Sequence, residues 1–335
     1  MPSFRPNISN DLDTIIFECN SNYDTIVEVT KWFLQIAYLI PGGILNILLL
    51  YTILFKNSEI YASSSFFLIY STDCFVSFSM IFLDIIGRTL VYFTPLCPII
   101  APMFYEPLIG FKIMMIVLHH SRACKSLIQI LLVVNRMSCV IYPIRYGKMW
   151  MRPLKYLIIL VFVIPFSIDW NLIISRVYMQ PTFGGIYMEY IKKVAWASQS
   201  RFQLIFITIA LLFTIVCTSV IFYTLVMLPK RLRNVERTLS LGTAYISMSF
   251  IILVVFQFLF AFYSDIFTTS TIFGYSLLSY DILNVGSPII MHCVSSKLRN
   301  HVLRGSRKLS SAARVVPVSN VTSTNGWVNL IVITL

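Results

Sequence analysis

Charged residues are scarce in this sequence. Asp, Glu, Lys and Arg together make up 12% of the 335 residues, whereas a soluble domain carries about 25%. Hydrophobic residues reach 57% and aromatic residues 15%. So few polar side chains cannot cover a water-exposed fold, which excludes an ordinary soluble domain. The composition predicts a protein that lies mostly in a membrane.

Metal-binding and catalytic motifs are also lacking. The chain has four histidines and seven cysteines, and the cysteines are scattered without a CxxC pair or a Cys/His cluster. The His119-His120 pair has no further histidines beside it at helical spacing. Neither a GxSxG motif nor a glycine-rich phosphate-binding loop occurs. We therefore expect no enzyme activity, no metal and no cofactor.

Seven long apolar runs dominate the chain instead. A helix of about 20 apolar residues crosses the hydrocarbon core of a bilayer, and peptide groups there must be satisfied within a helix or a closed barrel. The runs are too long and too uniformly apolar for barrel strands. We predict an all-α integral membrane bundle with seven transmembrane helices over 32–55, 66–86, 108–140, 154–174, 202–228, 241–262 and 272–294.

The third run is the least regular, because charged and imidazole side chains from His119 to Lys125 interrupt it. Dividing it into 96–118 and 126–142 would give eight helices. Cytoplasmic connections are enriched in Lys and Arg, and an eighth helix would put the basic cluster at Lys230 and the basic tail on opposite sides. The charges therefore favour seven helices, with the N-terminus outside and the C-terminus in the cytoplasm.

Under this topology the basic residues gather on the inner side. The inner connections hold Lys56, Arg145, Lys148, Arg152, Lys230, Arg231, Arg233, Arg237, Lys297, Arg299, Arg304, Arg307, Lys308 and Arg314. The longer outer connections hold Arg5, Lys31, Arg88, Arg176, Lys192, Lys193 and Arg201. The net charge of +12 then lies mostly on the side that meets anionic lipid or a cytoplasmic partner. Nucleic-acid binding is not needed to explain it.

The chain divides accordingly into three parts. Residues 1–31 form an extracellular segment, 32–295 the bundle and 296–335 a cytoplasmic tail that begins with a short amphipathic helix over 296–303. The sequon at Asn7 predicts glycosylation on the outer side. Cys97 is expected to form a disulfide with either Cys19 or Cys124, because spacing does not give connectivity.

Polar side chains inside the predicted spans are the candidate functional residues, since an ionisable group at bilayer depth persists only when it is paired or hydrated. A first group, on the first, second and seventh spans, predicts a polar cluster that joins these helices or acts as a switch: Asn46, Asp73, Asn284 and Ser287. A second group comprises Asp84, Asp169 and Asp281, which are expected to pair with Arg88, Arg122, Lys125 or Arg176, or to contact a ligand.

Several of these positions resemble landmarks of rhodopsin-like G-protein-coupled receptors. The matching residues are Asn46, Asp73, Asn135-Arg136-Met137 and Ser287-Pro288. The departures are Asn135 in place of the usual acid, Ser287 in place of the usual Asn, and no cysteine in the second outer connection. The run 124–137 (CKSLIQILLVVNRM), followed by Tyr142-Pro143, looks like the nematode serpentine chemoreceptors of class gamma.

This resemblance covers about 32–303 and implies a chemosensory receptor for a small molecule, coupled to a heterotrimeric G protein. It implies the plasma membrane, of sensory cilia, as location, and it assigns Arg136 to the switch and the G-protein contact. Arg145, Lys230, Arg231 and Arg233 would border that contact. A transporter or channel is the alternative function, a non-signalling membrane scaffold is a third class, and pairing with a second receptor copy stays open.

A ligand would enter between the outer halves of the third, fifth, sixth and seventh helices, where aromatic side chains offer an apolar lining. The expected ligand contacts are Trp196, Phe202, Phe206, Phe256, Phe260, Tyr275, Tyr280 and Asp281. Aromatic side chains at helical spacing also serve as core or lipid-facing residues. The sequence alone leaves each of these positions open between the two roles.

Overall fold

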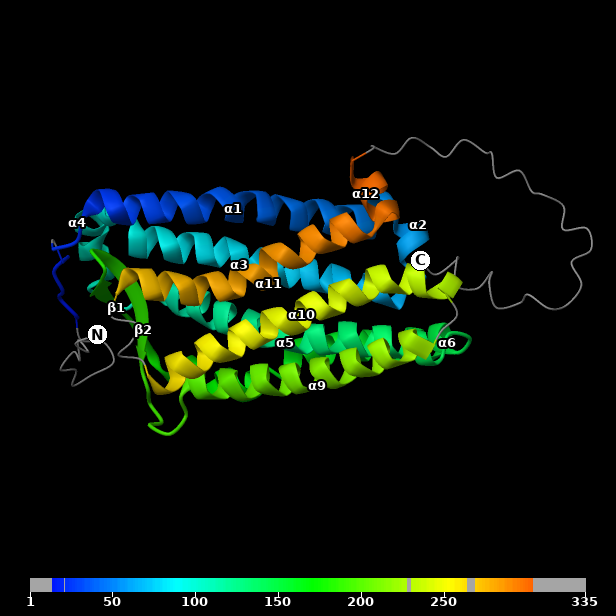
Figure 1. The fold of residues 1–335 in the computed structure, drawn as a ribbon. Helices are drawn as coiled ribbons and strands as arrows, with labels where there is room; N and C mark the ends of the chain where they lie inside the picture. Colours follow the sequence, from blue (N-terminus) through cyan, green and yellow to red (C-terminus); the bar gives the residue numbers. More distant parts are fainter. Residues whose placement is uncertain (1–13, 21, 228–229, 264–268, 304–335) are drawn as a thin grey trace, which may run out of the picture.

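The computed structural model describes residues 14–20, 22–227, 230–263 and 269–303. Within them, seven helical segments are long and apolar enough to cross a membrane. They lie side by side as one elongated bundle (Figure 1). The predicted seven-helix membrane bundle is confirmed, and the third apolar run forms one helix rather than two.

The membrane-crossing elements follow the predicted order. They are α1 (Thr25–Tyr51) with a π-helical extension (Thr52–Lys56), α3 (Ser65–Tyr92), α5 (Ile109–Ile141), α7 (Leu154–Val163) with α8 (Phe166–Ile174), α9 (Gln199–Met227), α10 (Lys230–Phe262) and α11 (Ser270–Val294). Short elements connect them: α2 (Ser58–Tyr61), η2 (Thr94–Leu96), α4 (Cys97–Ile100), η3 (Ala101–Phe104), α6 (Tyr146–Met151) and α12 (Ser296–Leu303). The last matches the predicted amphipathic helix over 296–303.

The long helices form a closed ring. α1 packs on α3 and α11, α5 on α3 and α9, and α10 on α9 and α11, while α7 and α8 lie outside α5. α3 and α5 have the largest buried share of the membrane-crossing helices. The interior of the bundle is therefore lined mainly by α3, α5 and α11, with α9 and α10 closing the other side.

The first helix begins earlier than its apolar run, at Thr25 instead of residue 32. Asp24 caps it, because its carboxylate accepts hydrogen bonds from the backbone N–H groups of Ile26 and Val27. α1 also continues through Pro41-Gly42-Gly43 instead of breaking there. A Cβ atom on Gly42 would lie 2.8 Å from Val285 of α11, so this glycine permits the close packing of α1 on α11.

A β-hairpin that the sequence analysis did not predict follows α8. Strands β1 (Arg176–Thr182) and β2 (Gly185–Ile191) pair antiparallel, with Thr182 opposite Gly185. The two loop residues, Phe183 and Gly184, both have positive φ, at 53° and 81°, which is typical of a type I′ turn. Phe-Gly is a weaker signal for this turn than Asn-Gly, and the segment reads as an ordinary outer loop.

The hairpin covers one end of the bundle. A Cβ atom on Gly185 would lie 2.2 Å from the carbonyl oxygen of Val91 at the end of α3, so only glycine fits there. Phe183 is 3% exposed and packs 5.5 Å from the ring of Phe273 on α11. We call this end of the molecule the hairpin end and the opposite end, which carries α2, α6 and α12, the α12 end (Figure 1).

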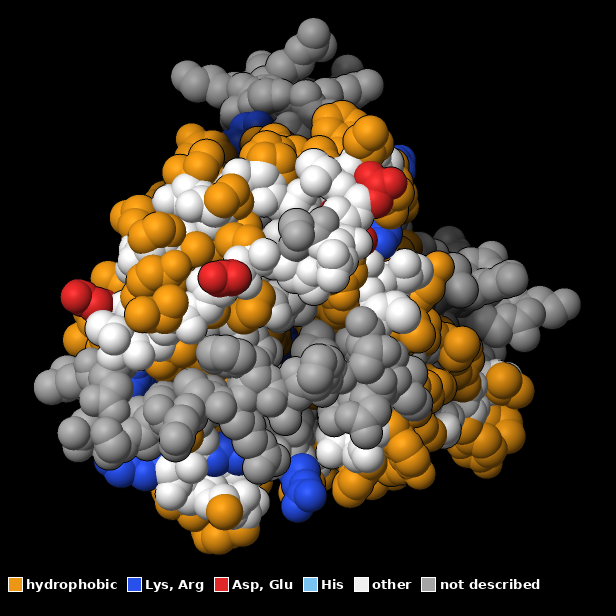
Figure 2. All heavy atoms as spheres, turned by 90° about the vertical axis from the view of Figure 1, so that its left-hand side faces the viewer, with side chains coloured by type: hydrophobic (Ala, Val, Ile, Leu, Met, Phe, Trp, Pro, Cys, Tyr) orange, Lys and Arg blue, Asp and Glu red, His pale blue; other side chains and the backbone are white. Residues whose placement is uncertain are grey.

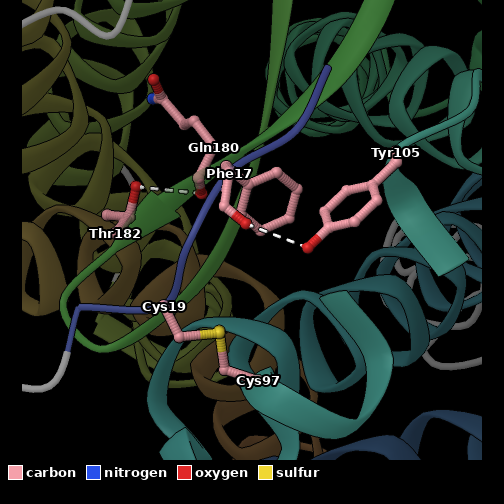
Figure 3. The surroundings of a disulfide bond; sticks show 6 residues. All are labelled: Phe17, Cys19, Cys97, Tyr105, Gln180 and Thr182. Atoms are coloured by element: carbon pink, nitrogen blue, oxygen red, sulfur yellow. Dashed lines mark hydrogen bonds between the residues drawn. A yellow bond between two sulfur atoms is a disulfide. The ribbon is translucent and has the colours of Figure 1, made fainter. Parts of the chain in front are cut away.

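An N-terminal segment is attached to the same end by a disulfide. Cys19 is bonded to Cys97 at the start of α4, with a Cα–Cα distance of 6.1 Å (Figure 3). Tyr105 points toward Phe17 in the same view and donates a hydrogen bond to its carbonyl oxygen at 3.3 Å. Of the two predicted pairings of Cys97 the structure contains the one with Cys19, whereas Cys124 is buried inside α5.

Candidate functional site

The half of the interior next to the hairpin contains a closely hydrogen-bonded ion pair between Arg88 of α3 and Asp281 of α11. Arg88 Nη2 lies 2.7 Å from both carboxylate oxygens. Tyr38 of α1 donates to Asp281 at 2.5 Å and accepts from Arg88 Nη1 at 3.0 Å. The prediction that Arg88 lies in an outer connection is wrong, because the residue is 2% exposed inside α3. Asp281, an expected ligand contact, has two internal partners.

A second pair, Asp84 with Arg122 of α5, is much looser. Arg122 Nη2 lies 3.6 Å from Asp84 Oδ1, beyond hydrogen-bond distance. The guanidinium carbon of Arg122 lies 4.5 Å from the ring centroid of Tyr280, and the Tyr280 hydroxyl donates to Gln257 of α10 at 2.9 Å. These contacts bring α3, α5, α10 and α11 together around one guanidinium.

The third buried carboxylate differs from the prediction. Asp169 of α8 was expected to pair with a Lys or Arg, but it lies 2.9 Å from His120 Nδ1 and accepts from Gln199 Nε2 at 2.8 Å. Asp169 is fully buried. This cluster fixes α8 against α5 and α9, so its contacts are those of helix packing.

The centre of the bundle holds a further ion pair, between Asp73 of α3 and Lys125 of α5, at 2.7 Å. Lys125 also donates to Ser77 at 2.5 Å, and Asp73 accepts from Gln129 at 2.8 Å. Ser287 of α11 donates to Asp73 at 3.4 Å. Lys125 was expected to serve the carboxylates Asp84, Asp169 and Asp281. Lys125 pairs with Asp73 instead, because it lies about one helical turn beyond Arg122 on α5, nearer the α12 end, where Asp73 of α3 is within reach.

The predicted polar contact between the first and seventh helices is present beside this pair. Pro288 has no N–H group, so it leaves the carbonyl of Asn284 four residues earlier without its helical donor. Asn46 of α1 donates to that carbonyl at 3.3 Å and to the carbonyl of Gly42 at 3.0 Å. Asn46, Asp73, Asn284 and Ser287 thus form contacts that join α1, α3 and α11, as predicted.

Toward the α12 end, charged pairs give way to a neutral ring of hydrogen bonds. Asn135 donates to Ser65 at 3.0 Å, Ser65 donates to Tyr146 at 2.9 Å, and Tyr146 donates back to Asn135 at 2.8 Å. All three residues are buried. The ring ties the connecting helix α6 to α3 and α5. It occupies the place where the resemblance to rhodopsin-like receptors would put a carboxylate.

Arg136 follows Asn135 of this ring in the sequence and lines an apolar cavity of about 50 Å³. Its guanidinium carbon is 3.4 Å from the ring centroid of Phe66. The cavity is lined by α3, α5, α10 and α11 through Phe66, Tyr70, Leu132, Arg136, Gly242, Tyr245, Ile246, Ser287, Ile290, Met291 and Val294. Ser287 therefore belongs both to this lining and to the Asp73 cluster.

The other residues predicted for the inner contact lie at the same end. Arg145 is exposed in the turn before α6, whereas the side chains of Lys230, Arg231 and Arg233 are outside the described part of the structure, as is Asn7. α12 is held at this end by a hydrogen bond between Tyr61 and His301 Nδ1 at 2.8 Å. Lys56 also donates to the His301 carbonyl at 2.8 Å.

The aromatic residues predicted as ligand contacts do not form one cluster. Trp196 and Tyr275 are 68% and 54% exposed, and Trp196 packs against Phe202 at 6.1 Å. Phe202, Phe206, Phe256, Phe260 and Tyr280 are half-buried. Phe260 packs against the cluster of Val91, Tyr92, Phe183 and Phe273 beneath the hairpin. Of these predicted aromatic contacts, Tyr280 is the one that lies against a buried charge, the guanidinium of Arg122.

Sequence reasoning did not single out the buried glutamines. Gln129, Gln199, Gln203 and Gln257 all lie inside apolar helices and are between 0% and 7% exposed. An amide in an apolar run was a signal available from the sequence, since a buried amide needs partners. Three of these four side chains donate to a buried carboxylate or a carbonyl of a neighbouring helix.

The hairpin strands carry perturbed titratable groups. Burial raises the pKa of Glu189 above its ordinary value, although a hydrogen bond from the Tyr190 N–H opposes this shift. Burial, together with the neighbouring Glu189, raises the pKa of Tyr178 to about 12. Figure 2 views the hairpin end and shows separated acidic and basic side chains among hydrophobic ones rather than one charged patch. Among the described residues, no three His, Cys, Asp or Glu side chains are grouped to hold a metal ion.

Comparison with known proteins gives a consistent family. Residues 32–302 match the family described as Srg family chemoreceptor. Serpentine receptor class gamma-14 of Caenorhabditis elegans is 46% identical over 333 residues, covering 98% of this chain and 99% of that receptor. Class gamma-16 and class gamma-13 of the same organism are each 39% identical, over 288 and 307 residues, and cover 86% and 90% of this chain and 89% and 90% of their own lengths. This chain is therefore a multi-pass membrane protein of the Srg chemoreceptor family.

Proposed function

We propose that this protein is a chemosensory receptor that detects a small molecule at the hairpin end and activates a heterotrimeric G protein at the α12 end. The hairpin end is then extracellular. The Cys19–Cys97 disulfide supports this orientation, because disulfides persist in oxidising surroundings outside the cytoplasm. The basic residues of the predicted inner connections support it as well. The plasma membrane, of sensory cilia, is the location that this role requires.

The observation that carries the proposal is the cavity beside Arg136. It lies between α3, α5, α10 and α11, and among the described side chains Arg136 is the basic one in its lining. A partner segment could enter here if α10 moved away from α11. Tyr245 of α10 now reaches over Gly286 and donates to the Ile282 carbonyl of α11, so such a movement has a specific contact to break. Tyr142, Ile144 and Arg145, which are exposed between α5 and α6 at the same end, would border the partner.

Coupling between the two ends follows from shared residues. Ser287 contacts Asp73 in the centre and lines the cavity at the α12 end. Asp281, two turns earlier on α11, belongs to the Arg88 cluster at the hairpin half. A ligand that shifts α11 would therefore act on both clusters. In this scheme the ligand favours one of two existing states of the bundle.

The test separates signalling from folding at Arg136. The full-length chain is expressed in a heterologous cell, and calcium or cyclic-nucleotide responses to a chemical panel are recorded with and without functional G protein. Arg136→Ala should abolish the response while surface expression stays normal. Arg152→Ala, an exposed arginine at the same end, is the matched control and should respond normally.

Two results would contradict the proposal. A response that survives loss of the G protein would identify a channel or transporter. Loss of Arg136→Ala from the cell surface would assign Arg136 to folding and remove it from the partner contact. Direct measurement of flux or current in reconstituted vesicles distinguishes a transporter from a channel.

A further inference from the structure

We propose that Arg122 and Gln203, with His119 beside them, form a donor site for the oxygen of an uncharged, carbonyl-bearing small molecule, such as a ketone, an ester or a lactone. The inference rests on the proposed function only in placing the ligand in the hairpin half of the bundle. It adds the chemical class of the ligand and the residues that recognise it.

Arg122 is the exceptional basic residue of this interior. Its side chain is 12% exposed, and within the described residues its polar contacts are the 3.6 Å approach to Asp84 and the ring of Tyr280. Its Nε atom is buried without a hydrogen-bond partner there. The Nε atom of Arg88, one layer closer to the hairpin end, is unpaired there as well, but the Nη atoms of Arg88 donate to Asp281 and Tyr38. A buried guanidinium without hydrogen bonds is costly, so an acceptor at Arg122 stabilises it.

One further donor lies close to Arg122. His119 is one turn earlier on α5, has Arg122 as a charged neighbour and forms a side-chain hydrogen bond with Gln203 of α9. Gln203 is 2% exposed. Its Nε2 atom and the Nδ1 atom of His119 have no hydrogen-bond partner among the described residues. Two obligatory donors without a partner in the described part of the chain, Arg122 Nε and Gln203 Nε2, therefore lie close to His119 in the same buried region.

Charge balance decides which acceptor fits. Asp84 and Asp281 carry two negative charges, and Arg122 and Arg88 carry two positive charges, so the two neighbouring pairs cancel. A carboxylate ligand would add a negative charge with no counter-ion in a low-dielectric interior, which is costly. An uncharged carbonyl oxygen satisfies the N–H donors and leaves the charges balanced.

The surroundings suit an apolar body attached to that carbonyl. The Tyr280 ring lies against Arg122, and Phe206 follows Gln203 by one turn of α9. The hairpin contributes Tyr187, which has Arg122 and Asp84 among its charged neighbours and packs 5.3 Å from Phe273. The hairpin therefore lies over the donor site.

The experiment measures binding to the purified full-length chain in lipid nanodiscs, without G protein. The probes are ketones, esters and lactones of four to ten carbons, with the alcohol and carboxylate of matched length, and the readout is saturation-transfer NMR. At least one carbonyl compound should bind, and the matched carboxylate should bind at least tenfold more weakly. Gln203→Leu should weaken carbonyl binding about tenfold, the effect of one lost hydrogen bond of about 1.4 kcal/mol. His119→Phe removes the side chain that positions Gln203 and should weaken carbonyl binding as well.

Gln35→Leu, which changes a half-buried amide on α1, is the matched control and should bind normally. A thermal melt of each variant separates lost binding from lost fold, and the pair Arg122→Met with Asp84→Leu removes the guanidinium without leaving an unpaired charge. Three outcomes overturn the proposal: no carbonyl compound binds, the carboxylate binds more tightly, or affinity is unchanged in folded Gln203→Leu, His119→Phe and the double variant. Because no G protein is present, these outcomes leave the signalling proposal standing.

Discussion

The two halves of the bundle interior are held together by different kinds of interaction. Next to the hairpin, buried charges join the helices, and a disulfide and the hairpin cover the end. Toward α12, the contacts are a neutral ring of hydrogen bonds and an apolar cavity. Breaking one partner of a buried ion pair costs much more than losing a neutral hydrogen bond. We infer that the hairpin half is the fixed part and that the α12 half is the part that can rearrange.

The largest effect should come from the Arg88 pair. Arg88→Met leaves Asp281 buried without its cation and should lower the free energy of unfolding by about 3–5 kcal/mol. Combining Arg88→Met with Asp281→Leu should recover much of this loss, because neither charge then remains unpaired. Thermal unfolding in one fixed detergent measures both. An Arg88→Met protein as stable as the unmodified chain would show that the hairpin half does not depend on its charges.

The disulfide should rank second. Cys97→Ser should lower stability by about 2–4 kcal/mol, because the bond between Cys19 and Cys97 restricts the unfolded chain. Cys19→Ser should have the same effect, and the two together no more than either alone. Cys293→Ser, at an exposed free cysteine of the α12 end, serves as the control. Unequal losses in the two single variants would point to a role for one cysteine outside the bond.

A smaller effect is expected in the neutral ring. Tyr146→Phe removes the hydroxyl that links Ser65 and Asn135 and should cost about 1–2 kcal/mol. The loss should appear as faster hydrogen exchange in α6, with little change at the hairpin. Tyr142→Phe, at a residue that is 56% exposed, is the control. Equal acceleration at both ends of the bundle would contradict the division into two halves.

The smallest effect concerns pH at the hairpin. Because burial raises the pKa of Glu189, the folded hairpin holds that proton more tightly than the unfolded chain does. Its stabilising contribution is therefore complete below the ordinary pKa of a glutamate and is lost as the pH rises through the shifted value. Hydrogen exchange of the hairpin amides, corrected for the intrinsic rate, should accelerate over that range. Glu189→Gln should remove this dependence, and the same acceleration in that variant would assign it to another group.

Much of the fold was predictable because a bilayer imposes strict conditions on a sequence. Each apolar run had to become a helix, and the interruption between His119 and Lys125 did not divide α5, because those side chains point to partners inside the bundle. The short helix α12 followed from its amphipathic pattern. The hairpin escaped prediction, because its turn is Phe183-Gly184 and its conformation depends on the close contact of Gly185 with Val91.

The sequence predicted which residues belong to the candidate site, but it did not predict which of them pair with each other. Four carboxylates were recognisable because burying an ionised group in an apolar helix costs free energy: Asp73, Asp84, Asp169 and Asp281. Each has a partner in the structure. Which partner each one has depends on helix rotation and depth. For that reason Lys125 pairs with Asp73 and His120 with Asp169. The buried glutamines were overlooked, because a single neutral amide changes the hydropathy of a run very little.

The sequence by itself determined the class of protein, the number of membrane-crossing helices and the resemblance to class gamma chemoreceptors. These properties depend on local composition and on short motifs, which no tertiary contact can change. Only the tertiary structure decided that Arg88 donates hydrogen bonds to Asp281 and Tyr38 while Arg122 stays 3.6 Å from Asp84, that Cys97 pairs with Cys19, and that a hairpin covers the end of the bundle. These are relations between helices that are distant in the chain, and they are set by packing rather than by composition.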